Sequence, residues 1–356
     1  MNLFASLIFI TYVALSLLAR LNLAPRAVQY YIKLTHYGLV TVVAATYGLL
    51  LALFAKLFDK DLRLDISYYV GRVMVTLGSI VLGVDCVVSG GEFLENPEFQ
   101  AVLVGNHQAT LDMITMSAIF PRHCTVMAKK SLRAVPVLGA FMAATHAVFV
   151  DRGNSAKARQ AMDKAIKEMN AKKLSLFVYP EGTRARTRER TMLPFKKGAF
   201  HLAVQAQIPI VPVVFSAYDD IFDSKAKSFV GGTVHIKVLP PIPTEGIAID
   251  DKETINELLT ETREMMIATY IDISAKVPTP GAPDGSSSSS DSDDEGHRRH
   301  PLRDSVSIHE QPMPINGAVE PDSLVQDQKM DREDGYLDDY AVRQRRAVGR
   351  DGEEEE

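Results

Sequence analysis

Two long uncharged runs of apolar residues stand near the start of the chain. The first covers residues 3–19 and the second covers residues 37–55, and a basic residue closes each of them. Each run approaches the roughly 20 residues with which a helix crosses the hydrocarbon core of a bilayer. The pattern therefore predicts a pair of membrane-anchoring helices within residues 1–66. A third apolar stretch, residues 73–84, is too short to span a bilayer, and we place it in the membrane interface or in the protein core.

Short apolar segments alternate with amphipathic segments in the middle of the chain. Strand-like runs occur at 86–88, 101–104, 124–127, 147–150, 174–178, 210–215 and 234–239. Helical spacing of apolar residues follows Ser155, a typical N-cap residue, and recurs within 198–207 and 255–266. This alternation predicts an α/β fold, a mostly parallel sheet covered by helices on both faces. We place this domain at residues 67–276.

The last segment, residues 277–356, has a different composition. It is rich in proline, glycine and serine and carries 20 acidic and 9 basic residues, whereas the first 276 residues carry 24 acidic and 30 basic ones. Its few apolar residues cannot offset the entropy that ordering would cost. We therefore predict a disordered acidic tail, which either binds unknown protein partners or serves as a solvated spacer.

Composition excludes several classes of site. The chain has two cysteines, Cys86 and Cys124, which is too few for a disulfide framework or a cysteine-rich zinc module, and we expect no metal. Motifs of redox pairs, zincins, serine hydrolases, dinucleotide-binding folds and P-loops do not occur in the sequence. Residues 122–197 carry 17 basic and 5 acidic residues, a balance that favours an anionic ligand. Aromatic residues do not alternate with these bases, so we do not expect nucleic acid as a partner.

A histidine and an aspartate follow the predicted strand 101–104, at the edge of a parallel sheet where ligands gather. His107 and Asp112 are five residues apart, and on an ideal helix their side chains would diverge by about 140°. They can meet only if His107 lies on the turn before a helix and Asp112 lies one turn inside it. Asp112 would then fix the imidazole tautomer and leave the other ring nitrogen to accept a proton from a hydroxyl. The alternative is a structural histidine beside a capping aspartate.

Two further predicted strand ends carry an arginine. In residues 179–184, Gly182 suits a turn with positive φ, and Arg184 offers the forked donor that phosphate favours. Arg152 follows another strand. Each feature alone is better explained by a surface turn with a solvated arginine. Together they would surround a His/Asp pair on a basic domain with a membrane anchor, a combination suited to activating a hydroxyl near a phosphate.

Four sequence blocks resemble those of the glycerolipid acyltransferases. The blocks are NHQATLD at 106–112, VFVDR at 148–152, YPEGTR at 179–184 and IPIVPVV at 208–214. The stretch 192–214 is similar in particular to 1-acyl-sn-glycerol-3-phosphate acyltransferases. The resemblance covers about residues 84–274, and the order and spacing of four blocks make it much more specific than any single block.

This resemblance implies an acyl transfer from acyl-CoA, as co-substrate, to the sn-2 hydroxyl of lysophosphatidate in the bilayer, without a cofactor or a metal. It implies that His107 is the general base and that Asp112 orients it. It also implies that the substrate phosphate is bound by Lys129, Arg152, Glu181, Gly182, Thr183 and Arg184. Phosphatidic acid would be the product, in phospholipid biosynthesis at the endoplasmic reticulum.

Two alternative functions remain open. The first alternative is a related acyltransferase that uses glycerol 3-phosphate or another lysophospholipid, and the second is a non-catalytic membrane scaffold.

The first apolar run also fits a signal peptide, although no basic region precedes it. Three basic residues flank the second run on each side, so the positive-inside rule does not fix its orientation. Because acyl-CoA is expected in the cytosol and the chain has no N-x-[ST] sequon, we place the catalytic domain on the cytosolic side.

Overall fold

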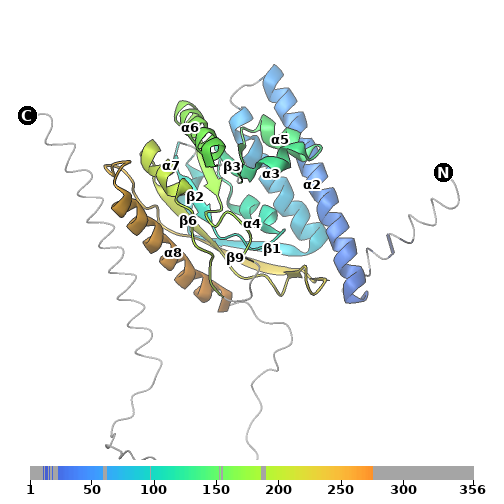
Figure 1. Ribbon diagram of the computed structural model, residues 1–356. Coiled ribbons are helices and arrows are strands. Elements are labelled where there is room, and N and C mark those ends of the chain that lie inside the picture. The colour runs from blue at the N-terminus through green and yellow to red at the C-terminus, as the bar shows by residue number, and fades with distance from the viewer. Residues whose placement is uncertain are drawn as a thin grey trace, which may run out of the picture. The chain divides into compact units, whose positions relative to one another are not determined.

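The alternating strands and helices build a sheet with helices on both faces (Figure 1). The computed structural model describes residues 11, 13–14, 16, 18, 23–58, 62–96, 98–151, 153, 155–185 and 190–275. Most of the first apolar run, Arg152 and the acidic tail lie outside the described residues. The domain boundaries after residues 66 and 276 stay predictions.

The described residues contain a seven-stranded, mainly parallel sheet. Its strands are β1 (Val84–Ser89), β2 (Val102–Gly105), β3 (Cys124–Lys129), β4 (Val148–Val150), β5 (Ser175–Val178), β6 (Ile210–Phe215) and β9 (Gly232–Val238). The spatial order is β1-β9-β6-β2-β5-β3-β4. Only the β6–β9 pair is antiparallel, so β1 and β9 run opposite to the other five strands. The predicted α/β fold class is confirmed.

A short hairpin between β6 and β9 was not predicted from the sequence. It consists of β7 (Phe222–Asp223) and β8 (Ser228–Phe229), which pair in antiparallel fashion. Two-residue strands are too short to show the period-2 alternation on which a sequence prediction depends.

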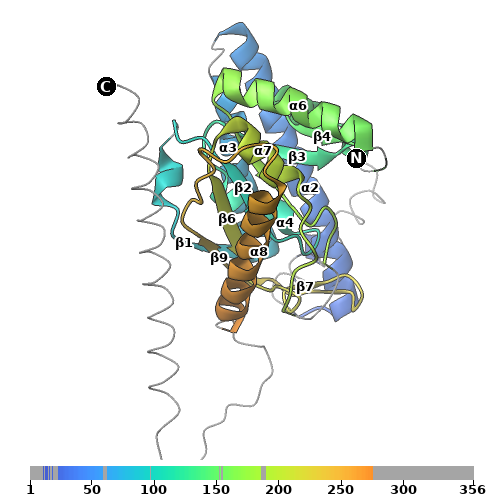
Figure 2. The ribbon, with the colours of Figure 1, turned by 60° about the vertical axis from the view of Figure 1, so that its left-hand side comes forward.

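Helices cover the two faces of the sheet in two groups (Figures 1 and 2). They are α2 (Arg26–Leu57), α3 (Leu62–Leu77), α4 (Asp112–Ile119), α5 (Leu138–Ala144), α6 (Ser155–Lys172), α7 (Gly198–Ala206) and α8 (Lys252–Ala275). Short π-helical and 3₁₀ segments are η1 (Gly78–Leu82), η2 (Glu92–Glu95) and η3 (Lys130–Ala134). Leu103 of β2 packs into a core with α2, α3 and α4, whereas its neighbours Val102 and Val104 pack into a second core with α6, α7 and α8. The alternation of side chains along a strand thus builds one apolar core on each face.

Helix α2 contains the second uncharged run and presents apolar side chains to the surface. The exposed ones include Leu39, Val42, Val43, Leu50, Leu53 and Phe54. Two helical stretches of the described chain, Arg26–Leu57 and Leu62–Leu82, are long and apolar enough to cross a membrane. The first of them contains one of the two predicted anchoring runs, whereas the second extends well beyond residue 66, the predicted end of the anchor.

The apolar stretch 73–84 contributes to the protein core, one of the two predicted places, with Met74, Leu82 and Val84 buried. Most of this stretch belongs to a helix that begins at Leu62 and continues through η1 to Leu82, so the apolar element is longer than the uncharged run in the sequence. Arg72 donates hydrogen bonds to the backbone carbonyls of Ser117 and Ala118, at 2.9 and 2.7 Å. These two carbonyls lie near the end of α4, where helical carbonyls lack partners of their own.

Candidate functional site

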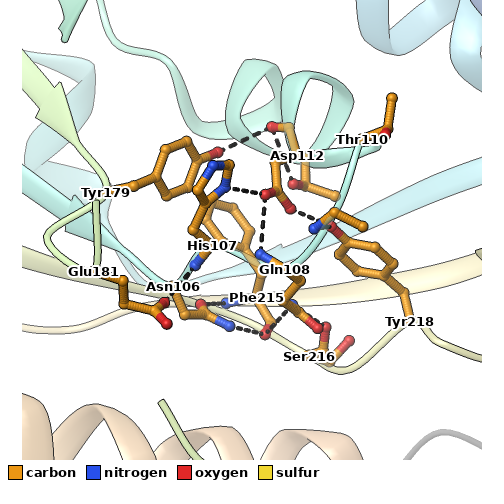
Figure 3. Close-up of polar contacts among 12 residues, drawn as sticks. Asn106, His107, Gln108, Thr110, Asp112, Tyr179, Glu181, Phe215, Ser216 and Tyr218 are labelled. Atoms are coloured by element: carbon orange, nitrogen blue, oxygen red, sulfur yellow. Dashed lines mark hydrogen bonds and ion pairs between the residues drawn. The ribbon is translucent and has the colours of Figure 1, made fainter. Parts of the chain in front are cut away.

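The His/Asp pair lies directly after β2, at the carboxyl end of the strand. His107 is on the turn that follows β2, and its Nδ1 is hydrogen-bonded to Oδ2 of Asp112 (Figure 3). The two side chains therefore meet as the sequence predicted. The position of Asp112 differs from the prediction in one detail: it is the first residue of α4 and does not lie one turn inside the helix.

The Asp112 carboxylate is buried and accepts hydrogen bonds at both oxygens. Oδ2 accepts from His107 and from the backbone N–H of Gln108 at 3.0 Å, and Oδ1 accepts from the hydroxyl of Tyr218 (Figure 3). An ionised carboxylate can only accept, so Nδ1 of His107 carries a hydrogen and the neutral imidazole has its lone pair on Nε2. Within the described part of the chain, Nε2 has no hydrogen-bond partner. The pair can therefore accept a proton at Nε2.

Two tyrosines, the partly buried Tyr179 and the buried Tyr218, hold this pair in place. The ring of Tyr179 stacks on the imidazole of His107, with centroids 4.2 Å apart and an interplanar angle of 16°. Its hydroxyl donates to the backbone carbonyl of Asp112 at 3.1 Å. Burial raises the pKa of Tyr179 and of Tyr218 well above the ordinary value, so both phenols stay protonated donors.

Sequence reasoning assigned no role to either tyrosine. Tyr179 at least follows a predicted strand, within a candidate block. Tyr218 lies 106 residues from Asp112 along the chain, and only the adjacency of β2 and β6 brings the two together.

The carboxylate of Glu181 accepts hydrogen bonds from two backbone N–H groups of the site. Its Oε1 accepts the N–H of His107 at 2.7 Å, its Oε2 accepts the N–H of Leu193 at 3.0 Å, and the residue is 2% exposed. Burial raises the pKa of the Glu181 carboxyl, and the two backbone donors oppose that shift. Glu181 thus ties the turn after β2 to the turn after β5.

The turn that carries Arg184 has the predicted backbone geometry. Gly182 has φ +70°, the left-handed conformation for which glycine was expected. The N–H of Ala185, directly after Arg184, donates to the carbonyl of His107 at 2.8 Å. Thr183 and Arg184 are exposed at the surface.

The amide side chains of the first block fix it to β6. Asn106 donates to the carbonyl of Phe215 at 3.0 Å and accepts from its N–H at 2.8 Å. Gln108 donates to the carbonyl of Ser216 at 2.9 Å (Figure 3). These bonds set the position of His107 between them.

A cavity of about 460 Å³ adjoins the pair. It is lined by five of the predicted site residues, His107, Asp112, Lys129, Thr183 and Arg184. The remaining lining is largely apolar and includes Ala44, Val70, Met74, Met116, Phe141 and Met142. The walls come from α2, α3, α4 and α5, and Gly48 of α2 permits the close approach of α5, because a Cβ atom there would lie 2.5 Å from the Phe141 ring. The cavity thus combines the basic side chains of Lys129 and Arg184 with an apolar chamber, which the remaining lining residues form.

The predicted site residues therefore divide into three groups. Those that line the cavity are His107, Asp112, Lys129, Thr183 and Arg184. Glu181 and Gly182 shape the turn beside it. Arg152 lies outside the described residues. In the part of the chain that the structure describes, no three His, Cys, Asp or Glu side chains come together as metal ligands.

Comparison with known proteins gives relatives of one kind. A family model described as "Acyltransferase" matches residues 86–216. The chain is 37% identical over 244 residues to a 1-acyl-sn-glycerol-3-phosphate acyltransferase of Saccharomyces cerevisiae, an alignment that covers 68% of this chain and 78% of the yeast protein. It is 36% identical over 249 residues to an uncharacterized acyltransferase of Schizosaccharomyces pombe, which covers 70% and 87% of the two chains.

One solved structure has the same fold. It is the 1-acyl-sn-glycerophosphate (LPA) acyltransferase PlsC from Thermotoga maritima, which superposes with a TM-score of 0.58. The match covers 71% of this chain and 100% of the Thermotoga chain, at 23% sequence identity.

Proposed function

This chain belongs to the 1-acyl-sn-glycerol-3-phosphate acyltransferase family, and on that premise we propose that it acylates the sn-2 hydroxyl of lysophosphatidate with acyl-CoA as donor, giving phosphatidic acid and CoA. The observation that carries the proposal is the position of the His107–Asp112 pair at the wall of a cavity that is both cationic and apolar. Such a cavity suits an acceptor with a phosphate and a fatty chain. The enzyme would act in phospholipid biosynthesis.

In this mechanism His107 is the general base. Nε2 takes the proton of the sn-2 hydroxyl while the oxygen attacks the thioester carbon, which forms a tetrahedral intermediate. The intermediate collapses by breaking the carbon–sulfur bond, and the imidazolium returns the proton to the CoA thiolate. Asp112 holds the tautomer and stabilises the imidazolium. No covalent enzyme intermediate is needed.

The acceptor phosphate is proposed to bind between Lys129, Thr183 and Arg184. Their side chains line the same cavity as His107, and an arginine fork combined with a lysine is a common phosphate clamp. Arg152 is proposed as a further phosphate ligand from its place in the second sequence block. Gly182 supplies the turn, and Glu181 contributes indirectly by fixing that turn to the backbone of His107.

The apolar part of the cavity is proposed to hold a fatty acyl chain. Met74, Met116 and Met142 line it, and methionine side chains adapt readily to a flexible hydrocarbon. Each methylene group taken out of water would contribute about 0.8 kcal/mol. The chamber therefore favours lipid acceptors or donors over soluble ones.

Membrane association agrees with the exposed apolar side chains of α2. We propose the endoplasmic reticulum as the location and the cytosolic side for the catalytic domain, where acyl-CoA is available. The acidic tail is proposed to act outside catalysis.

The test is a donor-and-acceptor panel on the detergent-purified full-length protein. Release of the free thiol, CoA from acyl-CoA or the carrier's own thiol from an acylated carrier protein, is followed for each donor, with lysophosphatidate, glycerol 3-phosphate or lysophosphatidylcholine as acceptor. We expect acyl-CoA with lysophosphatidate to react fastest and His107→Ala to abolish the reaction without unfolding the protein. A faster reaction with another acceptor would reassign the substrate, and full activity of His107→Ala would refute the mechanism.

A further inference from the structure

Tyr218 makes two hydrogen bonds inside the site that none of the sequence blocks predicts. It follows β6, is 1% exposed, and its hydroxyl lies between the turn after β2 and the start of α4 (Figure 3). The hydroxyl oxygen accepts the N–H of Ala109 at 2.9 Å and contacts Oδ1 of Asp112. Both partners belong to the segment that carries His107.

The direction of these two bonds follows from the chemistry of the groups. A backbone N–H can only donate, so the phenol oxygen accepts from Ala109. The single phenol proton then points to the Asp112 carboxylate, which accepts it at Oδ1. Asp112 is therefore an acceptor for three donors, one of which comes from a strand end remote in sequence.

We propose that Tyr218 is a positioning residue that completes a Tyr218–Asp112–His107 relay, in which its hydroxyl orients the carboxylate and sets the basicity of His107. This inference rests on the proposed function, because it concerns the base of that reaction. A carboxylate that shares its charge with a third donor attracts the proton on Nδ1 less strongly. Protonated His107 then loses the proton on Nε2 more readily, so the neutral imidazole is available as the base at lower pH.

Other ionisable groups face the same pair. They are Tyr37 of α2, Tyr179 after β5, Glu181 and Arg184 of the following turn, and Lys129 at the end of β3. Substituting Tyr218 by phenylalanine changes none of these groups and keeps the buried ring. Its effect can therefore be assigned to the hydroxyl.

The test is the pH profile of kcat/KM for Tyr218→Phe in the full-length protein. We expect the acidic limb, which reports loss of the proton from His107, to move to higher pH, and kcat at its optimum to fall about ten- to a hundredfold. The KM for lysophosphatidate should change less than about twofold, because Tyr218 is not among the residues that line the cavity with Lys129 and Arg184. An unchanged limb and kcat would overturn the proposal.

Tyr37→Phe is the matched control. Its hydroxyl is also buried and also binds the turn that carries His107, but it donates to the neutral backbone carbonyl of Thr110, at 2.7 Å. We expect this variant to leave the limb in place. An equal shift in both variants would mean that loosening of the turn, and not the charge of Asp112, causes the effect.

Two measurements keep the proposal testable if Tyr218→Phe unfolds or if the reaction is another one. Replacing Tyr218 with 3-fluorotyrosine strengthens the donor and should move the acidic limb to lower pH, and no shift or the opposite shift contradicts the relay. NMR titration of ¹⁵N-histidine-labelled protein, assigned with His107→Ala, measures the pKa of His107 without any substrate. A higher value in Tyr218→Phe supports the relay even if lysophosphatidate is not the acceptor, and an unchanged value refutes it.

Discussion

The carboxylate of Glu181 accepts the backbone N–H of His107 at 2.7 Å, so a residue of one sequence block fixes the turn that carries His107 in another. The bond is possible because β2 and β5 are neighbours in the sheet, with Val104 opposite Val178. The second carboxylate oxygen of Glu181 accepts the N–H of Leu193, a residue in the segment that leads to α7. One buried carboxylate therefore links the turn that carries His107 to the segment that precedes α7.

Glu181→Ala should lower both the stability and the activity of the protein. The change removes the charged acceptor of the partly buried N–H groups of His107 and Leu193, and each hydrogen bond to a charged group contributes about 1.5–3 kcal/mol. Thermal unfolding in detergent should show a melting temperature several degrees lower. Glu245→Ala, at an exposed position, serves as the control and should stay within about 0.5 kcal/mol of the wild type. A Glu181→Ala protein as stable as the wild type would exclude this role.

Asp112→Asn should leave the fold intact and slow the reaction. Asparagine is neutral, so it cannot stabilise the positive charge that His107 acquires when Nε2 accepts a proton. We expect kcat to fall about 10²- to 10⁴-fold, with a smaller change in KM. The measurement is steady-state CoA release, with thermal unfolding as the check on folding. Activity within a few-fold of the wild type would show that the carboxylate is not required.

The main part of this arrangement could be predicted from the sequence, because it depends on local spacing. The five-residue separation of His107 and Asp112 requires a turn followed by a helix, and the structure has both. A glycine within a turn after a strand indicated positive φ, and Gly182 adopts it. Hydrophobic alternation located all seven strands of the main sheet to within about two residues.

Other parts could not be predicted, because they depend on which strands lie side by side. The strand order places β2 between β6 and β5, and this brings Tyr218 and Glu181 to the His107 turn from opposite sides. A sequence does not state that order. The partners of Arg72, which bounds the apolar stretch 73–84 in the sequence, are unpredictable for a similar reason, since the two carbonyls on α4 are 45 and 46 residues away.

Arg184→Gln should weaken acceptor binding more than turnover. Arg184 lines the cavity at an exposed position, and its guanidinium is proposed to bind the acceptor phosphate. Loss of one charge-assisted contact should raise the KM for lysophosphatidate about tenfold and change kcat little. Lys225→Gln, on the exposed turn between β7 and β8, is the control for loss of one positive charge. An unchanged KM in Arg184→Gln would remove this residue from the proposed clamp.

Val126→Phe should change the acyl-chain preference. Val126 of β3 lines the apolar chamber, and the larger ring would take up part of its 460 Å³. Transfer of an 18-carbon acyl group should fall about tenfold relative to an 8-carbon group, because the lost methylene contacts are worth about 0.8 kcal/mol each. The assay compares the two acyl-CoA donors in competition. Val88→Phe on the exposed strand β1 is the control, and an equal effect there would point to a general loss of structure.

The two buried phenols predict an alkaline limit to stability. Burial raises the pKa of Tyr179 and Tyr218 above the value of about 10 that applies in the unfolded chain. Above pH 10 the unfolded chain therefore loses protons that the folded protein keeps, so the free energy of unfolding falls as pH rises further. Below pH 10 both states hold these protons, and no such dependence is expected. Thermal unfolding between pH 9 and 11 should show the decline in the wild type and a shallower decline in Tyr218→Phe, whose unfolded chain has one phenol fewer to ionise. Equal slopes for the two proteins would mean that Tyr218 ionises in the folded state as readily as in the unfolded one.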